Sequence, residues 1–327
     1  MINKLKGRLR KVKDRCMMPL EFYKDYRHYR KWNYNNLRNN DLCAYEARIL
    51  RQAHVIEKGL SLSSPRKGFG TARIDELLEM LHGFIEKGYA ADNFAFKNAV
   101  AVLNEYVEYQ STLDYQNDKL NKELISLNEL AGQAINAGIE KTSYKQLRNL
   151  IDGSYPEFFN SRHSMRQFST RDIDIEDIKK AVKLARKAPT ACNRQASRVY
   201  FYEDDATNSK LGEYIAGNTG FDSEVKKYLV ITADASAFYD TFERNQLYVE
   251  AGIFSMALVE ALHYYGIGSC ILQNGEKSKT NKRFREICDN IPQSERIVLF
   301  IAIGYYKDEF TYATSSRKAV DKVLICR

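Results

Sequence analysis

The chain has 327 residues, of which 44% are hydrophobic, and this is enough for a sizeable core and for two domains. It contains no run of 18 or more apolar residues, so we expect no membrane-spanning helix. Its start lacks the apolar core of a secretory signal peptide, and its six cysteines are scattered without a Cys-x-x-Cys pair. These features argue against a secreted disulfide framework and predict a cytoplasmic protein.

The basic charge is concentrated at the N-terminus. Residues 1–31 hold eleven Lys and Arg against three Asp and Glu, which equals the net charge of +8 of the whole chain. Within residues 1–18, Ile2, Leu5 and Leu9 recur at helical spacing and predict a basic helix with a narrow apolar stripe. Such a helix is compatible with weak contact with an anionic membrane surface, or with packing on its own protein or a partner. We predict no nucleic-acid partner, because the remainder of the chain carries no net charge.

From Asp41 to about Gly153 the apolar spacing predicts helices and no strand. Apolar residues recur every three or four positions, and Gly88 follows one of the expected helix ends. We therefore predict a basic N-terminal helix and a helical domain over residues 1–153. Within it, PRKGFG at residues 65–70 is a basic glycine turn that is either a simple loop or able to approach a phosphate.

Residues 154–327 show strand and helix patterns in alternation and predict an α+β domain. Asp174 is suited to cap a helix that Pro189 stops, and a long helix is expected from Leu247 to Tyr265. The runs 199–202 and 228–233 are predicted strands. The continuous apolar run 298–303 is expected to be a central strand that Gly304 ends.

Two polar motifs in this half point to a mononucleotide. RHSMR at residues 162–166 places Arg162 and Arg166 on either side of Ser164, and forked cationic donors suit a phosphate. PTACNRQ at residues 189–195 follows, with Asn193 and Gln195 suited to reading an amide-rich ring. One anionic tail and one polar aromatic ring describe a mononucleotide cofactor.

Together the motifs resemble the nitroreductase family of FMN-dependent oxidoreductases, over roughly half of the chain. The resemblance implies a nitroreductase-like sheet-and-helix sandwich over residues 154–327, an intertwined homodimer, and FMN at the subunit interface. Ser315 stands where a lysine is common in the family, so one cation is lost or replaced by Lys318. The implied cofactor-binding residues are Arg162, His163, Ser164, Arg166, Pro189, Thr190, Asn193, Gln195, Gly268, Leu272, Gln273, Asn274 and Arg317.

In the segment GIGSCILQN at residues 266–274, the glycines follow the expected long helix, and a strand is expected after the glycines. A dinucleotide-binding fingerprint needs the opposite order, strand, glycines and then helix, so we reject that fold. The resemblance implies that backbone amides at Leu272 to Asn274 approach the flavin ring. The alternative, that the glycines only end a helix, is compatible with this role.

The resemblance implies that NAD(P)H reduces FMN and that an unknown small-molecule acceptor, nitroaromatic or quinone-like in vitro, then takes the electrons. We name no catalytic side chain and no metal site. One alternative is a flavin enzyme that acts on a dedicated metabolite without nicotinamide. Another is a non-enzymatic flavin-fold scaffold tethered by its basic N-terminus. Residues 54–60 and 65–70 are also similar to nitroreductase-like proteins of bacterial polysaccharide-synthesis loci, which implies a role in polysaccharide biosynthesis.

Overall fold

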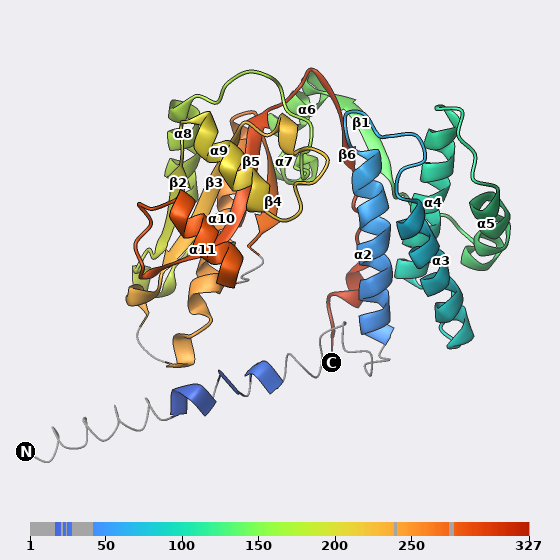
Figure 1. Ribbon diagram of the computed structural model, residues 1–327, viewed down its shortest axis with the longest axis horizontal. Helices are drawn as coiled ribbons and strands as arrows, with labels where there is room; N and C mark the ends of the chain where they lie inside the picture. The colour runs from blue at the N-terminus through green and yellow to red at the C-terminus, as the bar shows by residue number, and fades with distance from the viewer. Residues whose placement is uncertain are drawn as a thin grey trace, which may run out of the picture. The chain divides into compact units, whose positions relative to one another are not determined.

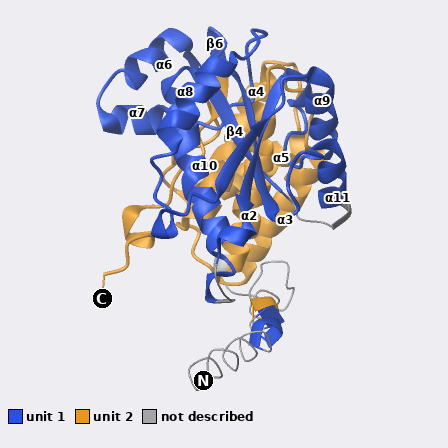
Figure 2. Cartoon of the chain, turned by 90° about the vertical axis from the view of Figure 1, so that its left-hand side faces the viewer, with its two compact units in different colours: residues 1–24, 142–310 blue, residues 25–141, 311–327 orange. Residues whose placement is uncertain are grey.

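The computed structural model describes residues 17–20, 22–23, 25–27, 42–238, 241–274 and 278–326. Most of the predicted basic helix, residues 1–16, lies outside the described residues. Figure 2 shows two compact units: a sheet unit built from Thr142–Phe310, and a helical unit in which the helices before Lys141 are joined by the C-terminal segment Thr311–Arg327. The expected domain boundary at residue 153 stays a prediction.

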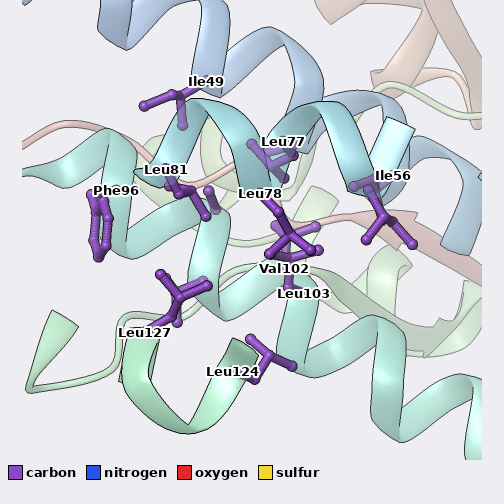
Figure 3. Close-up of a cluster of buried hydrophobic side chains, with 14 of the residues drawn as sticks. Ile49, Ile56, Leu77, Leu78, Leu81, Phe96, Val102, Leu103, Leu124 and Leu127 are labelled. Atoms are coloured by element: carbon purple, nitrogen blue, oxygen red, sulfur yellow. The ribbon is translucent and has the colours of Figure 1, made fainter. Parts of the chain in front are cut away.

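The helical unit is a set of amphipathic helices around one apolar core. Apolar side chains that recur every three or four residues meet there, among them Ile49, Leu77, Val102 and Leu124 (Figure 3). Its helices are α2 (Leu42–Leu60), α3 (Thr71–Glu86), α4 (Phe94–Ser111) and α5 (Asp118–Ala131). Among the described residues, no helix has both the length and the apolar character needed to cross a membrane.

The basic glycine turn at residues 65–70 is a loop that packs on its own unit. Gly68 N donates to Gln110 Oε1 at 2.8 Å, and Tyr106 donates to Phe69 O at 2.7 Å. A Cβ on Gly59 would lie 2.3 Å from the Phe69 ring, so the absence of a side chain at Gly59 leaves room for that ring. The two segments therefore pack against each other, as the loop interpretation predicts.

The sheet unit is centred on an antiparallel sheet in the order β2-β3-β5-β4 (Figure 1). On one face, α8 and α10 pack over strand residues such as Leu229 and Ile301. On the other, Phe284 of α11 meets Phe300 with 4.5 Å between ring centres. The strands are β2 (Ser197–Phe201), β3 (Lys227–Asp234), β4 (Ile267–Gln273) and β5 (Glu295–Tyr305). The helices are α6 (Tyr144–Ile151), α7 (Tyr155–Ser161), α8 (Ile175–Ala185), α9 (Asp205–Tyr214), α10 (Gln246–Tyr264) and α11 (Ser278–Ile287).

The structure confirms the α+β fold class and the main elements, including the Asp174 cap, which accepts a hydrogen bond from Glu176 N at 2.9 Å. Three details were wrong. A strand, β1 (Ile139–Ser143), interrupts the expected helical region and pairs with β6 (Glu309–Ala313). Helix α8 ends at Ala185, before Pro189, because 3₁₀-type bonds close its last turn. Gly304 lies inside β5, where a Cβ would come within 2.7 Å of Phe168.

Candidate functional site

Residues 162–166, here called the clamp segment, lie along the outer edge of β4. Helix α7 ends directly before them, and Arg162 already has extended backbone angles. Met165 N donates to Ser269 O at 2.9 Å, and Ser164 forms a parallel bridge with Ser269. Because β4 is an edge strand, the clamp segment extends the sheet locally.

Gly268 permits this approach. A Cβ built on Gly268 would lie 3.1 Å from Met165 Cγ and 3.3 Å from a ring carbon of Tyr306, which is tighter than ordinary contact. The fold thus brings together two of the motifs found in the sequence, RHSMR and the glycine segment after the long helix. Helix α10 ends at Tyr264 and β4 begins at Ile267, so the predicted order of helix, glycines and strand is confirmed.

The arginines of the clamp segment contain buried donors without acceptors. Arg166 is 5% exposed, and the Nε atoms of Arg162 and Arg166 have no hydrogen-bond partner among the described residues. Arg166 Nη1 reaches Ser164 O only at 3.4 Å. Buried guanidinium donors without acceptors are costly, whereas a bound oxyanion would satisfy them. The half-buried His163 and the exposed Ser164 lie within the same segment, so this donor set fits a phosphate group.

A buried histidine, which the sequence did not single out, fixes the start of the clamp segment. His263 Nε2 lies 2.8 Å from Ser161 Oγ, and His263 Nδ1 lies 2.7 Å from the Tyr306 hydroxyl. Ser161 uses its only hydroxyl proton on Phe158 O, at 2.8 Å, so His263 Nε2 must donate and Nδ1 must accept from Tyr306. Burial, and after it the nearby charge of Arg162, lower the pKa of His263 to about 3. The imidazole is therefore neutral and joins α7 and α10 to Tyr306, which directly follows β5.

We expect this histidine to make the protein lose stability in acid. With a folded pKa of about 3 and an unfolded value near 6.5, only the unfolded chain binds the proton between these limits. The free energy of unfolding should therefore fall by up to about 1.4 kcal/mol per pH unit as the pH drops through this window. His263→Phe should be less stable at pH 7.5 but should lose less stability between pH 6 and pH 4. Urea unfolding at several pH values measures this.

The control is Phe168→Leu, which removes part of a buried side chain and no titratable group. This variant should be less stable than the wild type at every pH and should keep the wild-type pH dependence. A His263→Phe variant whose stability falls as steeply as that of the wild type would show that His263 is not held neutral.

Residues 189–195, here called the turn segment, are strained and firmly supported. Cys192, Asn193 and Gln195 have left-handed backbone angles, with φ of 52°, 56° and 51°. Such angles cost energy in non-glycine residues and persist only where surrounding contacts impose them. The side chains of Asn193 and Gln195 are exposed, so the strained backbone presents both outward.

Two glutamates that the sequence analysis missed supply much of this support. Glu250, 1% exposed, accepts from Ala191 N at 2.8 Å through Oε1, while its buried Oε2 has no partner among the described residues. Glu243 takes two hydrogen bonds of 2.8 Å from Arg194. Thr190 Oγ1 accepts from Gln195 N at 3.2 Å. An acidic residue inside the apolar helix 247–265 was the only sequence signal for Glu250.

Substitutions can test the backbone strain at Cys192. Its thiol is exposed, so replacing this side chain removes no buried contact. We expect Cys192→Val to be less stable than Cys192→Gly by about 1–2 kcal/mol, because valine resists a positive φ and glycine does not. The order should reverse for the matched pair Lys183→Val and Lys183→Gly inside α8. Thermal unfolding compares the four variants. Equal stability of the two Cys192 variants would contradict a left-handed backbone there.

Of the predicted ring contacts, Leu272 and Gln273 end β4, the strand that contains Ser269, and Asn274 directly follows it. These three residues are here called the strand end. Leu272 is 5% exposed, and its methyl group lies 3.4 Å from where a Cβ on Gly217 would stand. Asn274 Nδ2 donates to Ile297 O at 2.8 Å, so this side chain anchors the strand end. The clamp segment and the strand end therefore share one sheet edge, separated by three to five residues, roughly 10–17 Å.

The turn segment lies at the opposite edge of the sheet. It precedes β2, which is separated from β4 by β3 and β5, or roughly 14 Å. It is also displaced along the strands. Ser269 of β4 pairs with Ile303 of β5, which in turn pairs with Lys227 of β3. Ser197 of β2 instead pairs with Ala233 of β3, which is six residues from Lys227, or roughly 20 Å along the strand. One chain therefore does not bring the turn segment and the clamp segment together.

Arg317 belongs to the helical unit. Its segment is held there by Ser315 N donating to the buried Glu57 at 3.0 Å and by Lys318 pairing with Glu46 at 2.6 Å. Lys318 is thus engaged in an ion pair, while Arg317 is exposed and donates to Ser315 O. The role of Arg317 at a phosphate stays a prediction. Within the described part of the chain, no cluster of His, Cys, Asp or Glu is arranged to hold a metal ion.

Comparisons with known proteins found one family model and several similar proteins. Residues 160–235, which include both the clamp and turn segments, match the model of the Nitroreductase family. A protein of Archaeoglobus fulgidus named "Putative NADH dehydrogenase/NAD(P)H nitroreductase" is 26% identical over 149 residues, 46% of this chain and 83% of that protein.

Solved structures show the same kind of similarity. A nitroreductase family protein from Streptococcus pneumoniae is 24% identical, with 53% of this chain and 100% of that chain covered and a TM-score of 0.44. An FMN-dependent nitroreductase from Clostridium difficile is 22% identical, with 46% and 86% covered and a TM-score of 0.40.

The fold is α+β, and on the edge of its main sheet lies a segment whose buried arginine donors lack acceptors. Residues 160–235 of this sheet unit are similar to the Nitroreductase family, whose model they match.

Proposed function

We propose that this protein is an FMN-dependent oxidoreductase. The observation that carries the proposal is the pair of buried guanidinium nitrogens in the clamp segment that lack acceptors. A phosphate supplies the missing acceptors and the compensating charge. The family match over residues 160–235 supports the same cofactor, because it spans both motifs implied for FMN.

The sheet edge gives each part of the cofactor its binding groups. Arg162, Ser164 and Arg166 bind the phosphate, and His163 lies beside it. The backbone at Leu272 to Asn274, farther along β4, donates to the polar edge of the ring. When bound, FMN supplies the hydride and electron chemistry, while the chain holds and orients it.

The opposite edge of the sheet has a complementary role in a second copy. The turn segment and the clamp segment lie far apart within one chain. We therefore propose a homodimer in which each site takes the clamp segment from one chain and the turn segment from the other. Asn193, Gln195 and Thr190 then complete the ring site of the partner. The symmetry of a two-fold dimer generates two such sites.

NAD(P)H is the proposed reductant, in agreement with the name of the archaeal relative. The electron acceptor is a small molecule of unknown structure, with nitroaromatics and quinones as test compounds. Anaerobic addition of NADH or NADPH to the FMN-loaded protein should bleach the visible flavin bands. A loaded protein that neither nucleotide bleaches would instead act on a dedicated metabolite.

The cofactor assignment predicts that variants of the clamp arginines lose affinity for FMN because they lose contacts with its phosphate. Arg162→Ala and Arg166→Ala should each weaken FMN binding by about tenfold or more, because each removes a charge-assisted hydrogen bond. Arg283→Ala, an exposed arginine on α11, should bind FMN as the wild type does. Quenching of FMN fluorescence measures the affinities.

Riboflavin, which lacks the phosphate, provides the internal comparison. It should bind the wild type and both clamp variants with similar, low affinity. A wild type that stays colourless after saturation with FMN and desalting would refute the cofactor and leave the non-enzymatic scaffold.

The shared site predicts complementation between defective chains. Arg162→Ala/Arg166→Ala and Asn193→Ala/Gln195→Ala chains should each bind FMN poorly as homodimers. In a mixed dimer one site is intact, so co-refolded chains should recover about a quarter of the wild-type flavin content. Mixing each variant with itself is the control. No recovery, with mixed dimers shown by mass spectrometry, would refute the shared site.

A further inference from the structure

The sheet unit has a second hollow that neither the clamp segment nor the strand end uses. It is a groove of about 650 Å³ lined by α8, β2 and α10, with Thr190 and Gln195 of the turn segment at its border. Figure 1 shows α8 beside β2 at the outer edge of the sheet. Its floor is apolar, formed by residues such as Ile178, Val199 and Phe254.

The charged residues that line the groove are all cations: Lys179, Lys183, Arg186 and Arg198. Lys179 is paired with Glu176 at 2.7 Å, and Arg198 donates to Gln195 O at 2.6 Å. Lys183 and Arg186 have no carboxylate partner among the described residues. Two exposed cations above an apolar floor produce a positive field that no acidic lining residue offsets.

Ser197 adds a polar group to the lining. Its Oγ is buried, yet it has no hydrogen-bond partner among the described residues. Buried hydroxyls are normally satisfied, so this one is an unpaired polar group within the lining. The volume lies within the usual range of small-molecule sites, whereas a peptide or protein needs a larger surface.

We propose that this groove binds a small amphipathic anion, with a carboxylate or sulfonate head near Lys183 and Arg186 and an apolar body on the floor between α8 and β2. Thr190 and Gln195 also belong to the proposed ring site, so the groove adjoins the site of the proposed function. Such a ligand would contact the turn segment through Thr190 and Gln195. Its binding would therefore affect the strained backbone that carries Asn193.

The test uses the full chain and the probe 8-anilinonaphthalene-1-sulfonate, whose fluorescence rises in an apolar site. We expect saturable binding of one probe per chain. 2-Naphthoate and decanoate should displace it, whereas the uncharged 2-naphthamide should be at least about tenfold weaker than 2-naphthoate. Which acid competes better distinguishes an aromatic from an aliphatic ligand.

Variants of the lining residues show where the probe binds. Lys183→Glu/Arg186→Glu should weaken the probe by about tenfold or more, and Lys183→Arg/Arg186→Lys, which keeps both charges, should bind within about threefold of the wild type. Lys282→Glu/Arg283→Glu on α11 is the matched control and should change nothing. All the altered side chains are exposed, and thermal unfolding followed by circular dichroism checks that each variant folds.

Several results would overturn the proposal. If the Lys183→Glu/Arg186→Glu variant bound the probe as tightly as the wild type, or if 2-naphthamide competed as well as 2-naphthoate, the groove would bind only through its apolar surface. Displacement of the probe by FMN would make the groove part of the flavin site. Displacement by polyglutamate but not by naphthoate would indicate an acidic protein partner. A charge reversal that changes the oligomeric state would show that a second copy covers the groove.

Discussion

Two guanidinium groups whose Nε atoms are buried beside an edge strand constrain the rest of the sheet unit. Arg162 and Arg166 reach this position because Met165 bonds to Ser269 and because Gly268 has no side chain to keep the segment away. After burial itself, the charge of Arg162 also influences the state of the neighbouring histidine. His263 is neutral because burial and the field of Arg162 both oppose a further positive charge, and it can therefore accept from Tyr306 while donating to Ser161. The edge is thus prepared for an anion before any anion binds.

The sheet places the second half of the proposed site out of reach of the first. Its order puts the clamp segment and the turn segment at opposite edges, and its register puts them at different levels. Each half is nevertheless rigid by itself. Glu250 and Glu243 hold the strained backbone of the turn, as His263 and Gly268 hold the clamp. Two preorganised halves require little ordering when a ligand joins them, which favours affinity.

The helical unit accounts for sequence features that otherwise suggest a separate ligand site. Gly59 of α2 and the loop that contains Gly68 pack together, with Phe69 against α2 and Gln110 bonded to the loop backbone. The buried Glu57 and the half-buried Glu46 also hold the C-terminal segment through Ser315 and Lys318. The backbone amide of Ser315, which has a left-handed φ of 49°, thus serves the helical unit.

The sequence by itself determined what depends on local pattern and side-chain chemistry. Apolar spacing predicted α10, the central strand β5 and the fold class, and the residue types of RHSMR predicted an anion site. It did not predict β1, because a five-residue strand paired with distant β6 has no local signal of its own. Nor did it reveal Glu250 or His263, whose roles come from partners far away in the chain. Whether the clamp and turn segments meet was decided only by the tertiary structure, since strand order and register follow from packing across the whole sheet.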